Sequence, residues 1–129
     1  MSDFHVIKYY GAKFSAPRYN KLHEESLEFI KKELSDNKSK HTIVASHHVP
    51  TLLNYPEQYK GDVLNDAFAV ELFDYIENSD IDYWIFGHHH ENTPEFKIGD
   101  TKMLTNQLGY VKYENNDLFD TGIFFEIVR

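Results

Sequence analysis

Two short segments decide the fold of this chain: Thr42–His48 (TIVASHH) and Ile81–His90 (IDYWIFGHHH). Each is a brief, mostly apolar run that ends in histidines. Apolar runs of this length, rich in β-branched and aromatic residues, are typical of strands that are buried on both faces of a sheet. We therefore predict a buried strand in each segment, with Trp84 and Phe86 in the core and His88 more exposed.

Helical patterns alternate with these strands along the chain. The apolar residues of Tyr19–Leu34 recur at helical spacing opposite charged residues, which predicts an amphipathic surface helix. Phe68, Leu72 and Ile76 repeat every fourth residue and predict a second helix. Asn65 is the expected N-cap of that second helix. The resulting order of strand, helix, strand, helix and strand is typical of an α/β layer with a parallel portion.

Further strands are expected towards both ends of the chain. Phe4–Tyr10 alternates imperfectly before Gly11 and predicts a short strand. Two strands are expected to flank a turn at Gly99-Asp100, and Gly122–Val128 is expected to form a last strand. No repeat or linker divides the chain, so we expect one globular unit over residues 1–129.

Composition excludes several classes of partner and site. With 13 basic and 21 acidic residues, the net charge of -8 argues against general binding to nucleic acid or to an anionic membrane. The absence of cysteine excludes disulfides and thiolate metal sites. No apolar run approaches the roughly 18 residues that span a bilayer. A cytoplasmic location is therefore the expectation.

Histidines follow both buried strands, where open α/β sheets place their ligand sites. Neutral imidazole is a good ligand for zinc, iron, manganese or nickel. Gly87 is expected to let the backbone turn sharply before His88. His88 and His90 are two residues apart, so in an extended loop they point to the same side, whereas His89 points away. We predict that His47, His88 and His90 converge on one concave surface at the ends of adjacent parallel strands.

Isolated histidines have a simpler interpretation. His5, His23 and His41 stand alone in the sequence and are expected to be solvated or core residues. A histidine-rich solvent loop is the corresponding alternative for the two clusters. Two groups of histidines at two consecutive strand ends are hard to explain by packing, and this coincidence favours metal binding.

Two motifs resemble those of calcineurin-like metallophosphoesterases. Thr42–Pro50 resembles the strand and His-x-Pro segment of that family, and Trp84–His90 resembles its Gly-His-x-His motif. Relatives often have Asn-Pro-Arg-Gly-Tyr where this chain has NQLGY, so the arginine of that motif is missing here. The other segments that share the resemblance are Met1–Tyr10, Tyr19–Glu25, Leu64–Phe68 and Asn106–Tyr110.

The resemblance implies a hydrolase of phosphomonoesters or phosphodiesters that uses two divalent ions, Mn, Fe or Zn. Two-metal hydrolases hold such ions about 3.5 to 4 Å apart. Motif position assigns His47 and His88 to one ion and His90 to the other. His48 is the alternative to His47 as a ligand. His48, His89 and Asn106 are the candidates for catalytic roles.

The family motifs Asp-x-His, Gly-Asp-x-x-Asp and Gly-Asn-His-Asp/Glu do not occur before His47. In the family they supply the bridging carboxylate and the usual general acid. The resemblance therefore implies the C-terminal half of an α/β/β/α sandwich, a mixed sheet with flanking helices. One ion would keep two protein ligands and the other one, below the three or four of typical zinc sites. We expect weak or no activity from the chain alone, and pairing with the missing half or self-association.

Two other functions remain open at this point. The histidines could form a non-catalytic metal-binding or interaction module, which predicts tight metal binding without turnover. A simple α/β domain with solvent-facing histidines predicts neither binding nor turnover. The leading hypothesis, a phosphoesterase fragment, predicts activity only when the missing motifs are supplied.

Overall fold

A computed structural model describes residues 2–113 and 116–127 of the chain. The chain forms two compact units, of which the first ends at Ser39 and the second begins at Lys40. The single domain expected over residues 1–129 stays a prediction. Within the described residues, no helix is both long and apolar enough to cross a membrane.

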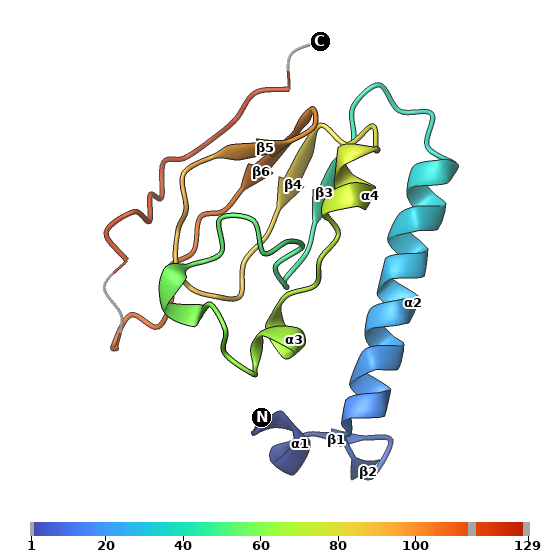
Figure 1. Cartoon of the computed structure of the whole chain (residues 1–129), viewed down its shortest axis with the longest axis vertical. Helices are drawn as coiled ribbons and strands as arrows, with labels where there is room; N and C mark the ends of the chain where they lie inside the picture. Colours follow the sequence, from blue (N-terminus) through green and yellow to red (C-terminus); the bar gives the residue numbers. More distant parts are fainter. Residues whose placement is uncertain (1, 114–115, 128–129) are drawn as a thin grey trace. The chain divides into compact units, whose positions relative to one another are not determined.

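The first unit combines a helical turn, a small hairpin and one long helix. A two-residue turn joins the hairpin strands, and its residues Tyr10 and Gly11 have φ values of 49° and 81°. Positive φ at both positions is the conformation that two-residue hairpins favour. The elements of this unit are α1 (Asp3–Val6), β1 (Lys8–Tyr9), β2 (Ala12–Lys13) and α2 (Ala16–Ser35) (Figure 1).

The long helix α2 confirms the predicted helix at Tyr19–Leu34 and begins slightly earlier. Pro17 lies in its first turn, where the missing N–H of proline costs no hydrogen bond. The predicted strand at Phe4–Tyr10 is wrong in its first half, which forms α1. There the backbone N–H of Ile7 donates to Asp3 O at 2.9 Å, and Phe4 packs against the ring of Phe14 with centroids 6.0 Å apart.

The second unit is built on one mixed sheet with the strand order β3-β4-β6-β5 (Figure 1). Strands β3, β4 and β6 are parallel, and β5 runs antiparallel to β6. The strand predictions in Thr42–Ala45 and Ile81–Phe86, and the two strands around Gly99-Asp100, are confirmed. The bounds are Ile43–Ala45 for β3, Tyr83–Ile85 for β4, Phe96–Ile98 for β5 and Thr101–Leu104 for β6.

The core of this unit forms around the central strands. Trp84 is 1% exposed and Phe86 5% exposed, whereas His88 is half-buried, as predicted. The expected burial of the first strand on both faces is wrong, because only Val44 of β3 is buried while Ile43 and Ala45 are exposed. Among the described strands β3 pairs only with β4 and so forms an edge of the sheet.

The predicted second helix is broken into α3 (Asn65–Phe68) and α4 (Phe73–Glu77). Between them the backbone is extended and bonds to Val49–Pro50, because Val70 N–H donates to Val49 O and Leu72 N–H to Pro50 O. These long-range bonds replace the helical ones that the spacing predicts. Asn65 is not the N-cap: Leu64 takes that place, and the Asn65 side chain donates to Tyr59 O at 2.7 Å.

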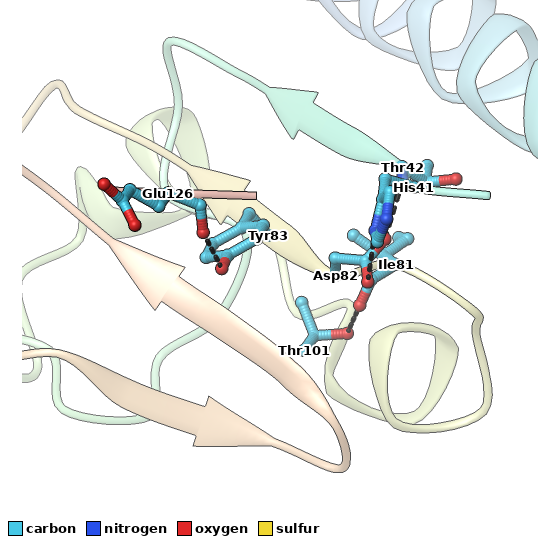
Figure 2. A network of polar contacts seen from close by, with 7 residues as sticks. All are labelled: His41, Thr42, Ile81, Asp82, Tyr83, Thr101 and Glu126. Carbon is cyan, nitrogen blue, oxygen red and sulfur yellow. Dashed lines mark hydrogen bonds and ion pairs between the residues drawn. The ribbon is translucent and has the colours of Figure 1, made fainter. Parts of the chain in front are cut away.

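Polar contacts fix the starts of the three parallel strands relative to one another. Asp82 accepts a hydrogen bond from the Thr42 backbone at 2.6 Å and lies 3.6 Å from His41 Nδ1 (Figure 2). Thr101 Oγ1 donates to Ile81 O at 2.8 Å. These bonds hold β3, β4 and β6 in register. Because the three strands are parallel, their carboxyl ends lie at the same end of the sheet.

The last described segment does not form the strand predicted at Gly122–Val128. Residues 122–127 have no regular secondary structure, and Val128 lies outside the described residues. The segment is held by side chains instead: Phe125 stacks on Tyr83 with ring centroids 4.6 Å apart, and Tyr83 OH donates to Glu126 O (Figure 2).

Candidate functional site

Two loops that follow β3 and β4 carry the histidines. The hydrogen bonding of the strands continues into these loops, because Ser46 N–H donates to Ile85 O at 2.9 Å and Gly87 N–H donates to His47 O at 3.2 Å. Parallel pairing thus brings the first histidines of the two loops side by side. This confirms the prediction that both clusters follow adjacent parallel strands.

His47 and His88 are in direct contact. Nδ1 of His88 lies 2.9 Å from Nε2 of His47, so one ring donates a hydrogen bond to the other. The ring of His48 lies near both, with centroids 5.2 Å from His47 and 4.9 Å from His88. Phe68 of α3 packs on the His88 ring at 4.5 Å. The structure therefore brings together two predicted metal ligands, with the alternative ligand beside them.

The spacing of this contact can be compared with that of two ligands of one metal ion. Zinc binds imidazole nitrogen at about 2.0 to 2.1 Å, so two ligands of one tetrahedral ion stand about 3.3 to 3.4 Å apart. The two ring nitrogens here are 2.9 Å apart, slightly closer than that spacing. Among residues 2–113 and 116–127, however, no group of three or more histidine, cysteine, aspartate or glutamate side chains could hold a metal ion. The described residues fit two positions of a coordination sphere and not a complete site.

His90 does not join that pair in a three-ligand group. Its ring packs edge-on against Tyr110 with centroids 4.5 Å apart. The prediction that His88 and His90 share one side assumed an extended loop, and it is wrong in its premise. His88 and His90 have φ values of 80° and 56°, in the left-handed region, whereas Gly87 does not have a positive φ. The sharp turn is thus made by His88 itself. Ligation of a second ion by His90 stays a prediction.

His89 points away from the pair, into the interior, and is 8% exposed. Its ring packs against those of Tyr55 and Phe86, at 5.8 Å and 6.0 Å. Its Nδ1 accepts hydrogen bonds from Glu91 N–H at 3.2 Å and from the Gln107 side chain at 3.1 Å. These contacts give His89 a clear structural role, and its catalytic role stays a prediction.

Asn106, the third catalytic candidate, is bound to the C-terminal segment. Its side chain donates to Asp120 O at 2.8 Å and accepts from Asp120 N–H at 3.1 Å. Both functions of the amide are therefore engaged with the backbone of one residue. These bonds direct the Asn106 side chain to Asp120 and not to any of the five clustered histidines.

The surroundings of half-buried His88 and buried His89 favour the neutral form of both imidazole rings. Burial, with smaller contributions from positive charge on His48, His47, His90 and His89, lowers the pKa of His88 to about 4. Burial also lowers the pKa of His89 to about 4, with a smaller contribution from His90. A neutral ring keeps a lone pair on one nitrogen, which a hydrogen-bond donor or a cation can use.

Three amide side chains that the sequence did not single out hold the loop His88–His90, hereafter the histidine loop. Asn92 and Gln107 pair through their backbone and side-chain groups, with Gln107 N–H to Asn92 Oδ1 at 2.6 Å. Asn116 donates to His90 O at 2.7 Å. Spacing gives no sign of this network of Asn92, Gln107 and Asn116, because its members are brought together only by the fold.

Two well-formed hollows of the structure lie away from the predicted site residues. A hollow of about 310 Å³ in the first unit is lined by residues around Arg18, and one of about 480 Å³ in the second unit lies between Tyr55 and Phe96. None of the six predicted site residues lines either hollow. The convergence of the predicted metal ligands on one concave surface stays a prediction.

Comparisons with known proteins agree with the two histidine motifs. A family model described as calcineurin-like phosphoesterase matches residues 3–92, which include both histidine-bearing segments and most of the first unit. Asn106–Tyr110, the last segment in which the sequence shows a resemblance, lies beyond this match. Searches of curated proteins and of solved structures gave no significant match. Because the family model covers well over half of the chain, the protein belongs to the calcineurin-like phosphoesterase family.

Proposed function

We propose that this chain takes part in the metal-dependent hydrolysis of phosphate esters, with His47 and His88 as ligands of one divalent ion. The observation that carries the proposal is the 2.9 Å contact between their ring nitrogens at the ends of neighbouring parallel strands. Both residues lie within the segment that matches the family. Members of this family typically bind metal ions.

The roles of the protein's own groups follow from their positions. His47 is exposed, and half-buried His88 is kept neutral by its surroundings. On binding an ion, the ring that donates the hydrogen bond moves its proton to its other nitrogen, so that both facing nitrogens offer lone pairs to the ion. A bound divalent ion supplies positive charge to neutralise phosphate oxygens. The chain needs such an ion for an anionic substrate, because its own net charge is -8. His48 is the alternative first ligand, and His90 is the proposed ligand of a second ion.

The number of converging donors limits the expected rate. Two-metal hydrolysis depends on both ions being held together against the substrate. A pair of imidazoles provides fewer ligands than the three protein ligands of typical catalytic zinc sites. We therefore propose that the chain by itself binds the ion weakly and turns over phosphate esters at a rate near background.

The test is calorimetric titration of the 129-residue chain with Mn²⁺ or Zn²⁺, together with hydrolysis of p-nitrophenyl phosphate and bis-p-nitrophenyl phosphate. We expect His88→Ala and His47→Ala to abolish most of the binding. His23→Ala is the matched control, because His23 lies exposed on α2 in the other unit. Robust turnover that survives in both His88→Ala and His90→Ala would overturn the metal mechanism.

A non-catalytic metal-binding module is the second candidate. It is favoured by one observation, that the described residues lack the ligand set of a two-metal catalytic site. Tight binding in such a module requires further ligands from a second copy of the chain. It predicts tight Zn²⁺ binding by the unmodified chain with no hydrolysis of either substrate, even when the missing family motifs are supplied on a second polypeptide. The phosphoesterase proposal predicts that hydrolysis rises in that mixture.

A further inference from the structure

Gln107 lies beneath the histidine loop and is only 8% exposed. Its side-chain oxygen accepts from His90 N–H at 2.9 Å, and its Nε2 donates to Glu91 O at 2.8 Å. The same Nε2 group donates to His89 Nδ1 at 3.1 Å. The buried Gln107 amide thus bonds to three consecutive residues: His89 and His90 of the histidine loop, and Glu91, which follows it.

The polarity of these bonds determines where His89 carries its proton. A backbone N–H can only donate and a backbone carbonyl can only accept, so His90 and Glu91 fix which end of the Gln107 amide is oxygen and which is nitrogen. The NH₂ group must then face His89 Nδ1, which also accepts from Glu91 N–H at 3.2 Å. Nδ1 therefore has no proton of its own, and His89 must be the Nε2–H tautomer.

The loop needs such support because of its backbone. His88 and His90 both have left-handed φ values, which are uncommon for residues other than glycine. Conformations of this kind persist only where the surrounding structure over-determines them. Gln107 bonds to the N–H of His90, while Asn116 bonds to its carbonyl at 2.7 Å. The side chains of Gln107 and Asn116 thus bind the backbone groups on both sides of the left-handed residue His90.

We propose that Gln107 is the positioning residue of the histidine loop. Its amide holds the left-handed turn that presents His88 to His47, and it selects the Nε2–H tautomer of His89. The consequence for cation binding by the His47–His88 pair rests on the proposed function. The positioning itself does not, since every contact that carries it is made within the protein.

The first test uses no cation. Nitrogen NMR of the unmodified chain labelled in its histidines should show neutral His89 with the proton on Nε2. Gln107→Met keeps the length of the side chain and removes its polar atoms, and it should shift the ring signals of His88 and His90. Gln58→Met is the matched control, because Gln58 is exposed and bonds to the side chain of Glu91 rather than to the loop backbone. It should leave those signals in place.

A proton on Nδ1 of His89 in the unmodified chain would overturn the proposal, and so would unchanged ring signals of His88 and His90 in Gln107→Met. The tautomer measurement needs no variant, so it decides even if Gln107→Met does not fold. In Zn²⁺ titrations, Gln107→Met should bind about tenfold more weakly, as expected when a residue that orients a ligand is lost. Equal affinity would contradict the positioning role. Absence of Zn²⁺ binding in the unmodified chain would instead count against the proposed function.

Discussion

The indole N–H of Trp84 donates a hydrogen bond of 2.9 Å to Ser46 Oγ, and that hydroxyl donates in turn to His48 O at 2.8 Å. Trp84 is the buried centre of β4, and Ser46 follows β3 directly. The two bonds therefore connect the core of the sheet to the first histidine-bearing loop. They explain how the loop after an edge strand keeps a defined position.

Ser46→Ala should lower the free energy of unfolding by about 1 to 3 kcal/mol, because a buried indole N–H is left without an acceptor. Urea unfolding followed by circular dichroism measures this change. The control is Trp84→Phe, alone and combined with Ser46→Ala. In the Trp84→Phe background no indole N–H needs an acceptor, so Ser46→Ala should lower the free energy of unfolding much less there. Equal costs in the two backgrounds would show that the bond contributes nothing to stability.

The sequence predicts the sheet well because its strands carry a local signal. β4 is a short β-branched and aromatic run with Trp84 at its centre, and such a run has few alternatives to a buried strand. Parallel pairing of β3 with β4 then makes the contact of His47 with His88 predictable. Each strand is thus predicted from residues that are close in sequence, and the pairing of the two strands then supplies the long-range contact.

The failures have long-range causes. Phe68, Leu72 and Ile76 keep helical spacing, but the backbone between α3 and α4 bonds to Val49 and Pro50 instead. The left-handed residue His90 bonds to Gln107 and Asn116, which lie further along the chain, and periodicity cannot show such contacts. For the same reason no sequence pattern indicates the bonds of Gln107 to His89, His90 and Glu91.

Gly99 allows a close approach between the β5–β6 turn and the end of α4. Its φ is 57°, and a Cβ at this position would lie 2.9 Å from Glu77 O. Gly99→Ala should therefore cost about 1 to 3 kcal/mol of stability, through the left-handed backbone and the displacement of Glu77. Gly61→Ala is the matched control: Gly61 has a φ of 81°, and nothing lies within 4 Å of its added Cβ. Thermal unfolding measures both variants. Equal losses of stability in Gly99→Ala and Gly61→Ala would exclude a contribution from the contact with Glu77.

Asn106 connects the end of β6 to the C-terminal segment through Asp120. Asn106→Ala should speed hydrogen exchange of the Asp120 amide, since its acceptor is lost. Asn106→Asp keeps an acceptor for that amide and should preserve more of its protection than alanine does. Equal exchange rates in the unmodified chain and in Asn106→Ala would mean that this contact does not order the segment in solution.

The stability of the fold should fall as the pH decreases from about 6.5 towards 4. Burial lowers the pKa of His89 from 6.5 to about 4, so in this range the unfolded chain binds a proton that the folded chain does not. Protons then favour the unfolded state, and the contribution of His89 is fully present above pH 6.5. One such group changes the free energy of unfolding by at most about 1.4 kcal/mol per pH unit. Urea unfolding at several pH values measures the slope.

His89→Asn isolates this effect from the carboxylates, which titrate in both proteins. Asparagine has no charge in this range, and its side-chain oxygen can replace Nδ1 as the acceptor for Gln107 and Glu91. The variant should therefore lose less stability than the unmodified chain between pH 6.5 and 4, and the two curves should converge as the pH falls. Parallel curves would mean that His89 binds its proton equally in the folded and unfolded chains, and that its burial does not oppose the charge.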